Sequence, residues 1–211
     1  GGVAPIANHV SGAEPVRVSP FSAGLRIAGS VRRTPLVPWT VAHPDIELRL
    51  KLECLQKTGS FKARGATNQM ALLSKEERRA GVVACSSGNH GRALAWAARR
   101  AGVAASIFLP EDAYPNKIEA IRREGAEAVI CPTREEAELA CAEAVQRGAT
   151  LVHPYDSWKT IEGASTVGLE IGEDWPEVDC VVVPVGGGGL ASGILLGLQA
   201  ALMRPTHLVG V

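Results

Sequence analysis

The chain has 211 residues, and its 22 Lys and Arg side chains balance 22 Asp and Glu, so the formal net charge is zero. Because no run of basic residues breaks this balance, we expect no nucleic-acid partner and no membrane-surface partner. Hydrophobic residues make up 46% of the chain, an ordinary value for a globular protein, and no apolar run is long enough for a membrane helix.

The first 45 residues contain many Pro and Gly and show weak periodicity, which predicts an irregular lead-in with one helix near 21–28. Alternation of apolar and polar residues then predicts a strand over 46–53, and a helix follows over 61–73. The sequence Ser74-Lys75-Glu76-Glu77 is a capping box, which begins a further short helix.

From residue 82 onward, strands and helices alternate. Apolar, β-branched runs predict strands at 82–85, 103–109, 128–131, 151–153, 181–185 and 207–211. Between them, helices are predicted at 92–101, 116–124, 134–147, 161–171 and 191–203. Strand and helix repeating at this spacing imply parallel strands joined by right-handed crossovers. The predicted fold class is therefore α/β, with parallel-rich sheets flanked by helices.

The five cysteines are scattered and form no CxxC pair, and the five histidines form no HxxxH pair. We therefore expect no disulfide framework, no metal site and a reducing, cytoplasmic location. Three of the cysteines lie in or beside apolar runs and are predicted to be buried thiols, namely Cys85, Cys131 and Cys180. Residues 1–10 lack the pattern of a signal peptide.

The segment TGSFK, which ends at Lys62, opens the helix predicted over 61–73. A lysine in the first turn of a helix lies near the positive end of the helix dipole, and this favours the neutral amine. Desolvation acts in the same direction, and a neutral amine can form a Schiff base. The alternative interpretation is a solvated surface lysine, which is the usual state of this residue type.

The segment SSGNHG at 86–91 directly follows the strand at 82–85. Free backbone N–H groups at the next helix start, together with the hydroxyls of Ser86 and Ser87 and the carboxamide of Asn89, could hold a carboxylate or a phosphate. The alternative is a plain capped turn, since Ser and Asn cap helices and Gly relaxes turns.

Four consecutive glycines, Gly186, Gly187, Gly188 and Gly189, follow the strand at 181–185. They let the backbone approach an anion closely, with a helix dipole behind, and this favours phosphate binding. Gly186, Gly188 and Ala191 also fit the GxGxxA spacing of a Rossmann dehydrogenase that binds NAD. The acidic residue that this motif requires would follow the next strand, where the chain stops, so spacing leaves this alternative open.

Four segments together resemble one family. KLECLQKTGSFKARGA at 51–66, SSGNHG at 86–91, NKIEAIRREGAE at 116–127 and PVGGGGL at 184–190 occur in the same order in threonine/serine dehydratases and serine racemase. These are fold-type-II pyridoxal-phosphate (PLP) enzymes, related to cysteine synthase and the tryptophan synthase β chain. The resemblance covers about 30–211 and implies a two-lobed, tryptophan synthase β-like fold, with a large lobe over 1–79 and 153–211 and a small lobe over 80–152.

The resemblance also implies roles for individual residues. Lys62 would carry the cofactor PLP as a Schiff base, with Phe61 beside the ring and Asn89 at its phenolic oxygen. The cofactor phosphate would lie against Gly186, Gly187, Gly188, Gly189 and Leu190. The substrate carboxylate would contact Ser86, Ser87, Asn89 and His90. Arg134 falls where serine racemase has a carboxylate-contacting arginine, although an exposed first-turn arginine explains this residue equally well.

The implied activity is that of an ammonia-lyase, which converts L-threonine or L-serine to a 2-oxo acid and ammonia by losing water. Lys62 would remove the α-proton. The alternatives are racemisation, in which Ser87 returns a proton on the face opposite Lys62, β-replacement as in cysteine synthase, the dehydrogenase described above, and an inactive fragment. Cys54, Lys57 and the segment AST at 164–166 depart from the family pattern and leave the exact substrate open.

Family members continue past the strand at 207–211, so we expect the chain to be a fragment with an incomplete large lobe. The absent part would supply the Ser or Cys that faces the pyridine nitrogen and, in some members, a divalent-cation site. We expect the full-length form to be a homo-oligomer that acts on a small-molecule amino acid, and we expect the 211-residue chain alone to bind PLP poorly.

Overall fold

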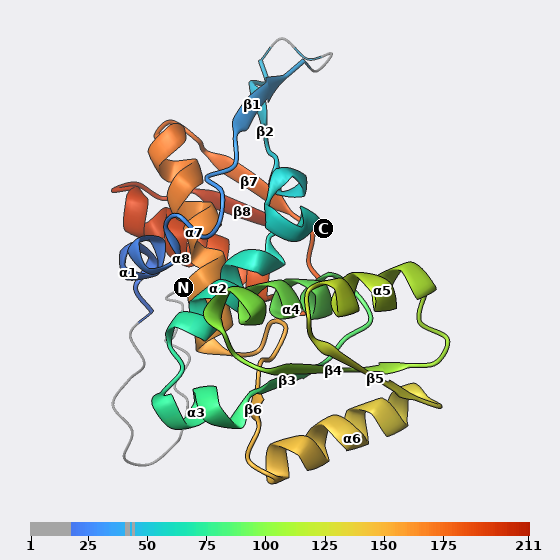
Figure 1. The fold of residues 1–211 in the computed structure, drawn as a ribbon. Helices are drawn as coiled ribbons and strands as arrows, with labels where there is room; N and C mark the ends of the chain where they lie inside the picture. The colour runs from blue at the N-terminus through green and yellow to red at the C-terminus, as the bar shows by residue number, and fades with distance from the viewer. Residues whose placement is uncertain (1–17, 41–42, 44) are drawn as a thin grey trace, which may run out of the picture.

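The computed structural model describes residues 18–40, 43 and 45–211 (Figure 1). A four-stranded parallel sheet occupies the middle of the chain, in the order β5-β4-β3-β6. Its strands are β3 (Val82–Cys85), β4 (Ala105–Pro110), β5 (Glu127–Cys131) and β6 (Thr150–Leu151). Figure 1 shows two helices over one face of this sheet, α4 (Asn89–Ala101) and α5 (Pro115–Arg123), and α6 (Arg134–Gln146) under the other. The α/β prediction is confirmed.

Both faces of the two inner strands, β3 and β4, are largely buried, as is usual for parallel strands. In β4, Ile107 and Leu109 face the cluster that contains Leu94 of α4. Phe108 points to the opposite face, where it packs in one cluster with Ala137 and Cys141 of α6. Because successive residues of a strand point to opposite faces, an apolar run without alternation is the pattern that such a strand requires.

A second pair of parallel strands, β7 (Cys180–Val183) and β8 (His207–Gly210), is joined through helix α8 (Gly189–Ala201). Helix α8 packs against α7 (Trp158–Asp174) at very short range. A Cβ added at Gly197 would lie 2.0 Å from the carbonyl oxygen of Ser165, and one added at Gly168 would lie 2.1 Å from that of Ile194. The glycines of these two helices therefore set the distance between them.

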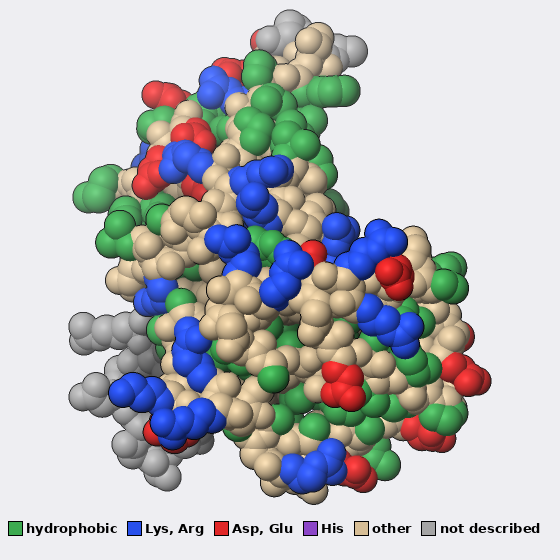
Figure 2. All heavy atoms as spheres, viewed as in Figure 1, with side chains coloured by type: hydrophobic (Ala, Val, Ile, Leu, Met, Phe, Trp, Pro, Cys, Tyr) green, Lys and Arg blue, Asp and Glu red, His purple; other side chains and the backbone are tan. Residues whose placement is uncertain are grey.

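The lead-in contains a strand that the sequence analysis did not predict. Strand β1 (Leu36–Trp39) pairs antiparallel with β2 (Leu48–Lys51), and this hairpin projects from the molecule (Figure 1). Hydrophobic side chains gather on it (Figure 2), and Trp39 and Ile46 are exposed. The prediction of an irregular lead-in was wrong here, because four residues that include a Pro give too short a pattern to identify a strand from local sequence.

Among the residues that the structure describes, three α-helices precede the four-stranded sheet, namely α1 (Pro20–Ile27), α2 (Lys62–Ala71) and α3 (Lys75–Ala80). The capping box at the start of α3 is confirmed, since Ser74 and Glu77 each accept a hydrogen bond from the other's backbone N–H. Helix α2 contacts both α4 and α7. It therefore touches both predicted lobes, and the boundaries at 79/80 and 152/153 stay a prediction.

All five cysteines are free thiols. Cys131 is buried as predicted and Cys85 is half-buried, but Cys180 is exposed. The prediction for Cys180 was wrong because β7 belongs to a sheet that has only two strands among the described residues, so its first residue is not covered from both sides.

Candidate functional site

One loop, which follows β6 and spans 152–157, contacts all three of the loops that the sequence analysis singled out. The carbonyl oxygen of Val152 lies 2.7 Å from Nε2 of His90 in SSGNHG, and that of Pro154 accepts a 2.7 Å hydrogen bond from Nζ of Lys62. The ring of Tyr155 packs on Gly187. Strands β3 and β6 are parallel neighbours, so their carboxyl ends, and the loops that follow, meet at one edge of the sheet.

Sequence reasoning gave this loop no role. The sequence feature that could have indicated a role is the position of the loop directly after a predicted strand. Ligands of parallel α/β sheets bind beyond the carboxyl ends of the strands.

Lys62 is the first residue of α2 and is half-buried. Its Nζ lies 5.0 Å from the ring centroid of Phe61 and donates to Pro154. Burial lowers the pKa of the Lys62 amine below the ordinary value of a lysine, because the charged form loses hydration. The structure thus places an oriented amine with an enlarged neutral fraction at this position, and a neutral amine is the nucleophilic form.

The turn before Lys62 is strained and carries unpaired hydroxyls. Thr58, in the 3-10 turn η2 (Lys57–Gly59), has φ of 62°, a left-handed conformation that costs energy in a residue with a branched side chain. The hydroxyl oxygens of Thr58 and Ser60 are buried without a hydrogen-bond partner in the described part of the chain. Strain together with unpaired buried hydroxyls is typical of a binding site.

The second half of SSGNHG forms the first turn of α4, which begins at Asn89, three residues earlier than predicted. The hydroxyl oxygen of Ser86 accepts hydrogen bonds from the N–H groups of Gly88 at 3.3 Å and Gly91 at 3.2 Å. Ser86 therefore holds the shape of the loop from inside. Ser87 is half-buried, and Asn89 is exposed at the N-terminus of the helix.

The imidazole of His90 points into the protein and is 4% exposed. Burial lowers the pKa of His90 to about 4, so the ring is neutral near pH 7, and its Nε2–H donates to Val152. The side chain joins α4 to the loop at 152–157. A substrate contact predicted for this residue would therefore have to come from its backbone N–H.

Glycine is required for different structural reasons at different positions among the four glycines after β7. A Cβ added at Gly187 would lie 2.3 Å from the ring of Tyr155, and one at Gly189 would lie 2.8 Å from the Tyr155 carbonyl oxygen. Gly188 has φ of 83° and is the N-cap of α8, whereas a Cβ at Gly186 would meet nothing within 4 Å. Two of the four are therefore required by contact with Tyr155.

Helix α8 begins at Gly189, two residues earlier than predicted, and no side chain caps it. The first backbone N–H groups of an α-helix have no partner within the helix. With Gly186 open beside them, these groups form a surface to which an anion such as a phosphate can bind. Leu190, in the same turn, packs against the core cluster that contains Val167 and Leu198.

Among the described residues, Arg134 forms no hydrogen bond or ion pair with these loops. It opens α6, which covers the face of the sheet opposite α4, and its side chain is 80% exposed with Glu138 at 3.4 Å. This is the surface arginine that the sequence allowed as an alternative, and its contact with a carboxylate stays a prediction.

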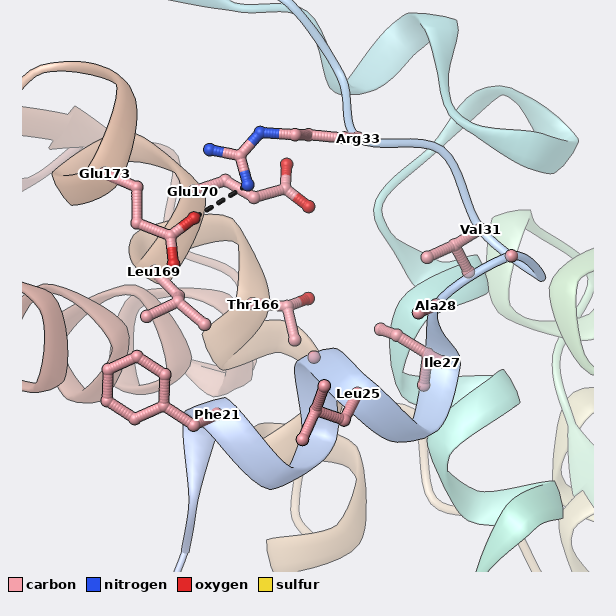
Figure 3. Close-up of a pocket in the computed structure, with 12 residues that line it drawn as sticks. Phe21, Leu25, Ile27, Ala28, Val31, Arg33, Thr166, Leu169, Glu170 and Glu173 are labelled. Atoms are coloured by element: carbon pink, nitrogen blue, oxygen red, sulfur yellow. Dashed lines mark hydrogen bonds and ion pairs between the residues drawn. The ribbon is translucent and has the colours of Figure 1, made fainter.

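A cavity of about 430 Å³ lies elsewhere, between α1, the segment that follows it and α7 (Figure 3). Apolar side chains such as Phe21, Leu25 and Leu169 line it beside the Arg33–Glu173 ion pair, whose N–O distance is 2.7 Å. It contains no residue of the three loops, so we assign the candidate site to the loop cluster, where the polar groups converge. In the described ranges, no cluster of His, Cys, Asp and Glu could hold a metal ion.

Comparison with known proteins identifies a family. The family model described as pyridoxal-phosphate dependent enzyme matches residues 27–211. The L-threonine ammonia-lyase of Thermotoga maritima is 47% identical over 170 residues, which are 78% of this chain and 41% of that protein. The serine racemase of Oryza sativa subsp. indica is 41% identical over 182 residues, which are 84% of this chain and 54% of that protein.

Solved structures give the same result. Maize serine racemase superposes with a TM-score of 0.85 at 38% identity, over 90% of this chain and 59% of that one. The threonine deaminase of T.th. superposes with a TM-score of 0.80 at 37% identity, over 90% of this chain and 63% of that one. The chain thus has the α/β fold of these fold-type-II enzymes and spans about half the length of the curated relatives it matches.

Proposed function

Because the chain belongs to the family of pyridoxal-phosphate dependent enzymes, we propose that it forms the cofactor-binding part of an ammonia-lyase that acts on L-threonine or L-serine. The products would be a 2-oxo acid and ammonia. Relatives named L-threonine ammonia-lyase and L-threonine dehydratase, 40–47% identical to this chain, support this substrate class. The observation that carries the proposal is the half-buried Lys62 amine, fixed on a loop that also packs against the glycine turn.

The residues present fit PLP. Lys62 offers an amine whose pKa is lowered by burial, and the buried hydroxyl of Ser60, two residues before it, lacks a protein partner in the described part of the chain. The uncapped start of α8, with Gly186 open beside it, fits a phosphate. When bound, PLP supplies a conjugated ring that stabilises negative charge at the α-carbon of an amino acid.

The other steps fall to the chain's own groups. Nζ of Lys62 would accept the α-proton, and its lowered pKa keeps a larger fraction of the amine able to do so. Pro154 orients this amine through its carbonyl oxygen. Ser87, Asn89 and the backbone N–H groups at the start of α4 would hold the substrate carboxylate, while Ser86 keeps their loop in shape.

Racemisation is the second candidate function, because serine racemases are among the similar proteins, one at 41% identity and one solved structure at a TM-score of 0.85. Ser87 would be the proton donor on the face opposite Lys62. A dehydrogenase does not fit, since the match to the pyridoxal-phosphate family over 27–211 includes both Lys62 and the glycine turn.

The proposal extends to location and assembly. Five free cysteines favour a reducing compartment and support a cytoplasmic location. No helix in the described ranges is both long and apolar enough to cross a bilayer. Homo-oligomeric assembly is proposed on the family resemblance alone.

Titration with PLP tests the central claim. Because the 211-residue chain alone is expected to bind PLP poorly, a form that spans the full length of the relatives is used. It is mixed with PLP, reduced with borohydride, digested and analysed by mass spectrometry, and the expected result is a pyridoxyl group on Lys62. A parallel assay for 2-oxo acids with L-threonine, L-serine and L-alanine should respond to the two hydroxy amino acids only. A pyridoxyl group that is spread over several surface lysines, or absent, would refute the proposal.

A further inference from the structure

The buried side chain of Arg64 lies two residues beyond Lys62 in the first turn of α2. We infer that Arg64, clamped between Glu53 and Glu170, is a positioning residue that holds Lys62 Nζ against the loop at 152–157. The inference rests on the proposed function, in which Lys62 carries the cofactor. It assigns to this ion-pair cluster a role in the chemistry of the site as well as in stability.

Arg64 is 0% exposed and uses all three nitrogens of its guanidinium. Nε and Nη2 donate to the two carboxylate oxygens of Glu53 at 2.9 and 2.7 Å. Nη1 and Nη2 donate to the two carboxylate oxygens of Glu170 at 2.6 and 2.9 Å. Both contacts are two-pronged, which fixes the direction of the side chain as well as its distance from each carboxylate.

Lys51 completes the cluster and balances its charge. Its Nζ lies 2.6 Å from Oε2 of Glu170 and 2.7 Å from the carbonyl oxygen of Thr34. Burial would raise the pKa of Glu170, but hydrogen bonds and charge from Arg64 and Lys51 outweigh it, and the net shift is downward. Two cations therefore face two carboxylates in a site that is largely closed to water.

The ion pair between Arg64 and Glu53 joins the two ends of the short segment 53–64, which contains Lys62. Glu53 lies in the 3-10 turn η1 (Glu53–Leu55), 11 positions before Arg64. Between them lie the left-handed Thr58 and the buried hydroxyl of Ser60, which has no hydrogen-bond partner among the described residues. A strained segment keeps its shape only where its surroundings hold it, and this ion pair joins its two ends.

The pair of Arg64 with Glu170 joins the two helices that carry the Lys62–Pro154 hydrogen bond. Lys62 begins α2, and the loop that contains Pro154 runs directly into α7, where Glu170 lies. The helices touch at backbone distance here, since a Cβ added at Gly163 would lie 2.6 Å from the carbonyl oxygen of Arg64. A shift of α2 along α7 would therefore move Nζ away from its acceptor.

A gain in stability does not by itself explain this cluster of buried ion pairs. Burying four charges costs hydration, and well-packed apolar side chains of similar volume often hold two helices equally well. What apolar packing does not supply is a fixed direction and register, which the two-pronged contacts of Arg64 provide. The cluster is thus suited to fixing where α2 begins.

The test measures the Lys62 amine in the cofactor-free protein. The chain has six lysines, and reductive methylation with ¹³C-formaldehyde gives each accessible amine a signal whose pH titration yields its pKa. The variant Arg64→Lys keeps the charge but loses the two-pronged contacts. We expect the pKa of Lys62 to rise toward that of a solvated lysine, and borohydride trapping of PLP on Lys62 to slow several-fold.

The matched control is Arg26→Lys, which disturbs a partly buried ion pair between α1 and α7. Arg26 binds Glu162 of α7 at 2.8 Å and also contacts Asn68 of α2, more than one turn after Lys62. This control should lower thermal stability but leave the pKa of Lys62 unchanged. If Arg64→Lys folds with the parent pKa, or if both variants shift it equally, the inference is overturned.

Should Arg64→Lys fail to fold, Glu53→Gln decides the question by the same two measurements, since Glu53 lies at the partly exposed side of the cluster. A failure of the proposed function can be told apart from a failure of the inference about Arg64. A parent protein that gives no borohydride-stable adduct on Lys62 would refute that function, whereas the titration of the cofactor-free protein would still decide the role of Arg64.

Discussion

Lys62 and Pro154 are 92 positions apart in the sequence, yet Nζ of the lysine donates a 2.7 Å hydrogen bond to the carbonyl oxygen of the proline. This contact joins the start of α2 to the loop at 152–157. Tyr155, the next residue, packs on Gly187, so the same few residues connect the amine to the glycine turn. The position of the Lys62 amine thus depends on a loop that the sequence analysis did not single out.

Lys62→Ala should abolish the borohydride-stable adduct and reduce 2-oxo acid formation to background, because Lys51, whose amine is also largely buried, is already paired with Glu170. The measurement is peptide mapping after reduction, together with the 2-oxo acid assay. Lys57→Ala, which removes a half-buried lysine five residues earlier, is the control and should keep both signals. If Lys57→Ala lost the adduct and the 2-oxo acid to the same extent, the losses would report damage to the turn and not removal of the Lys62 amine.

Gly187→Ala should weaken PLP binding and lower the free energy of unfolding by about 1–3 kcal/mol, the usual cost of overpacking. The added Cβ would lie 2.3 Å from the Tyr155 ring, so the ring or the turn must move. Gly186→Ala has open space at the same turn and should cost less stability. Urea unfolding and PLP titration measure the two effects.

The double variant Gly187→Ala/Tyr155→Ala isolates the contact between these two residues. The clash is with the Tyr155 ring, which Tyr155→Ala removes. Gly187→Ala should therefore lower the free energy of unfolding much less in the Tyr155→Ala background than in the parent protein. Strictly additive losses in this double-mutant cycle would mean that Tyr155 is not the reason for glycine at this position.

The buried His90 should make the protein less stable in mild acid. Its pKa is about 4 in the folded protein and near 6.5 when exposed, so the unfolded chain binds the proton more tightly. The neutral His90 side chain contributes fully to stability above about pH 6.5. This contribution is lost as the pH falls toward 4, so the free energy of unfolding drops by about 3 kcal/mol. Urea unfolding at several pH values measures it.

His90→Gln should flatten this part of the pH dependence, because glutamine does not titrate and its side-chain amide can still donate to Val152. His207→Gln, at an exposed position in β8, is the control and should leave the profile as it is. A parent and a His90→Gln variant with the same slope between about pH 6.5 and 4 would contradict the assignment.

Ser87→Ala should separate elimination from racemisation. Elimination needs the α-proton removed on one face only, in the proposed mechanism by Lys62, and should largely survive. Racemisation needs a donor on the second face and should collapse. Pyruvate and D-serine formed from L-serine are measured in parallel, and a variant that retains both products would show that Ser87 is only a turn residue.

The sequence alone determined much of this protein. The alternation of β-branched runs with helical segments predicted the α/β class, and the capping box at Ser74 predicted the start of α3. Four motifs in order predicted the family, and the family match and the similar structures bear this out. These features depend on residues close together in the chain, where local propensity and hydrogen bonding decide the conformation.

Only the tertiary structure decided how the site is held together. The inward-pointing His90, the pairing of β1 with β2, the packing of Tyr155 on the glycine turn and the burial of Arg64 between two carboxylates all depend on distant partners. Arg64 and Glu170 are 106 positions apart, and no periodicity or motif in either segment indicates the other. Such contacts form because α2 and α7 pack together, and packing reflects the shapes of both surfaces, which neither stretch of sequence contains by itself.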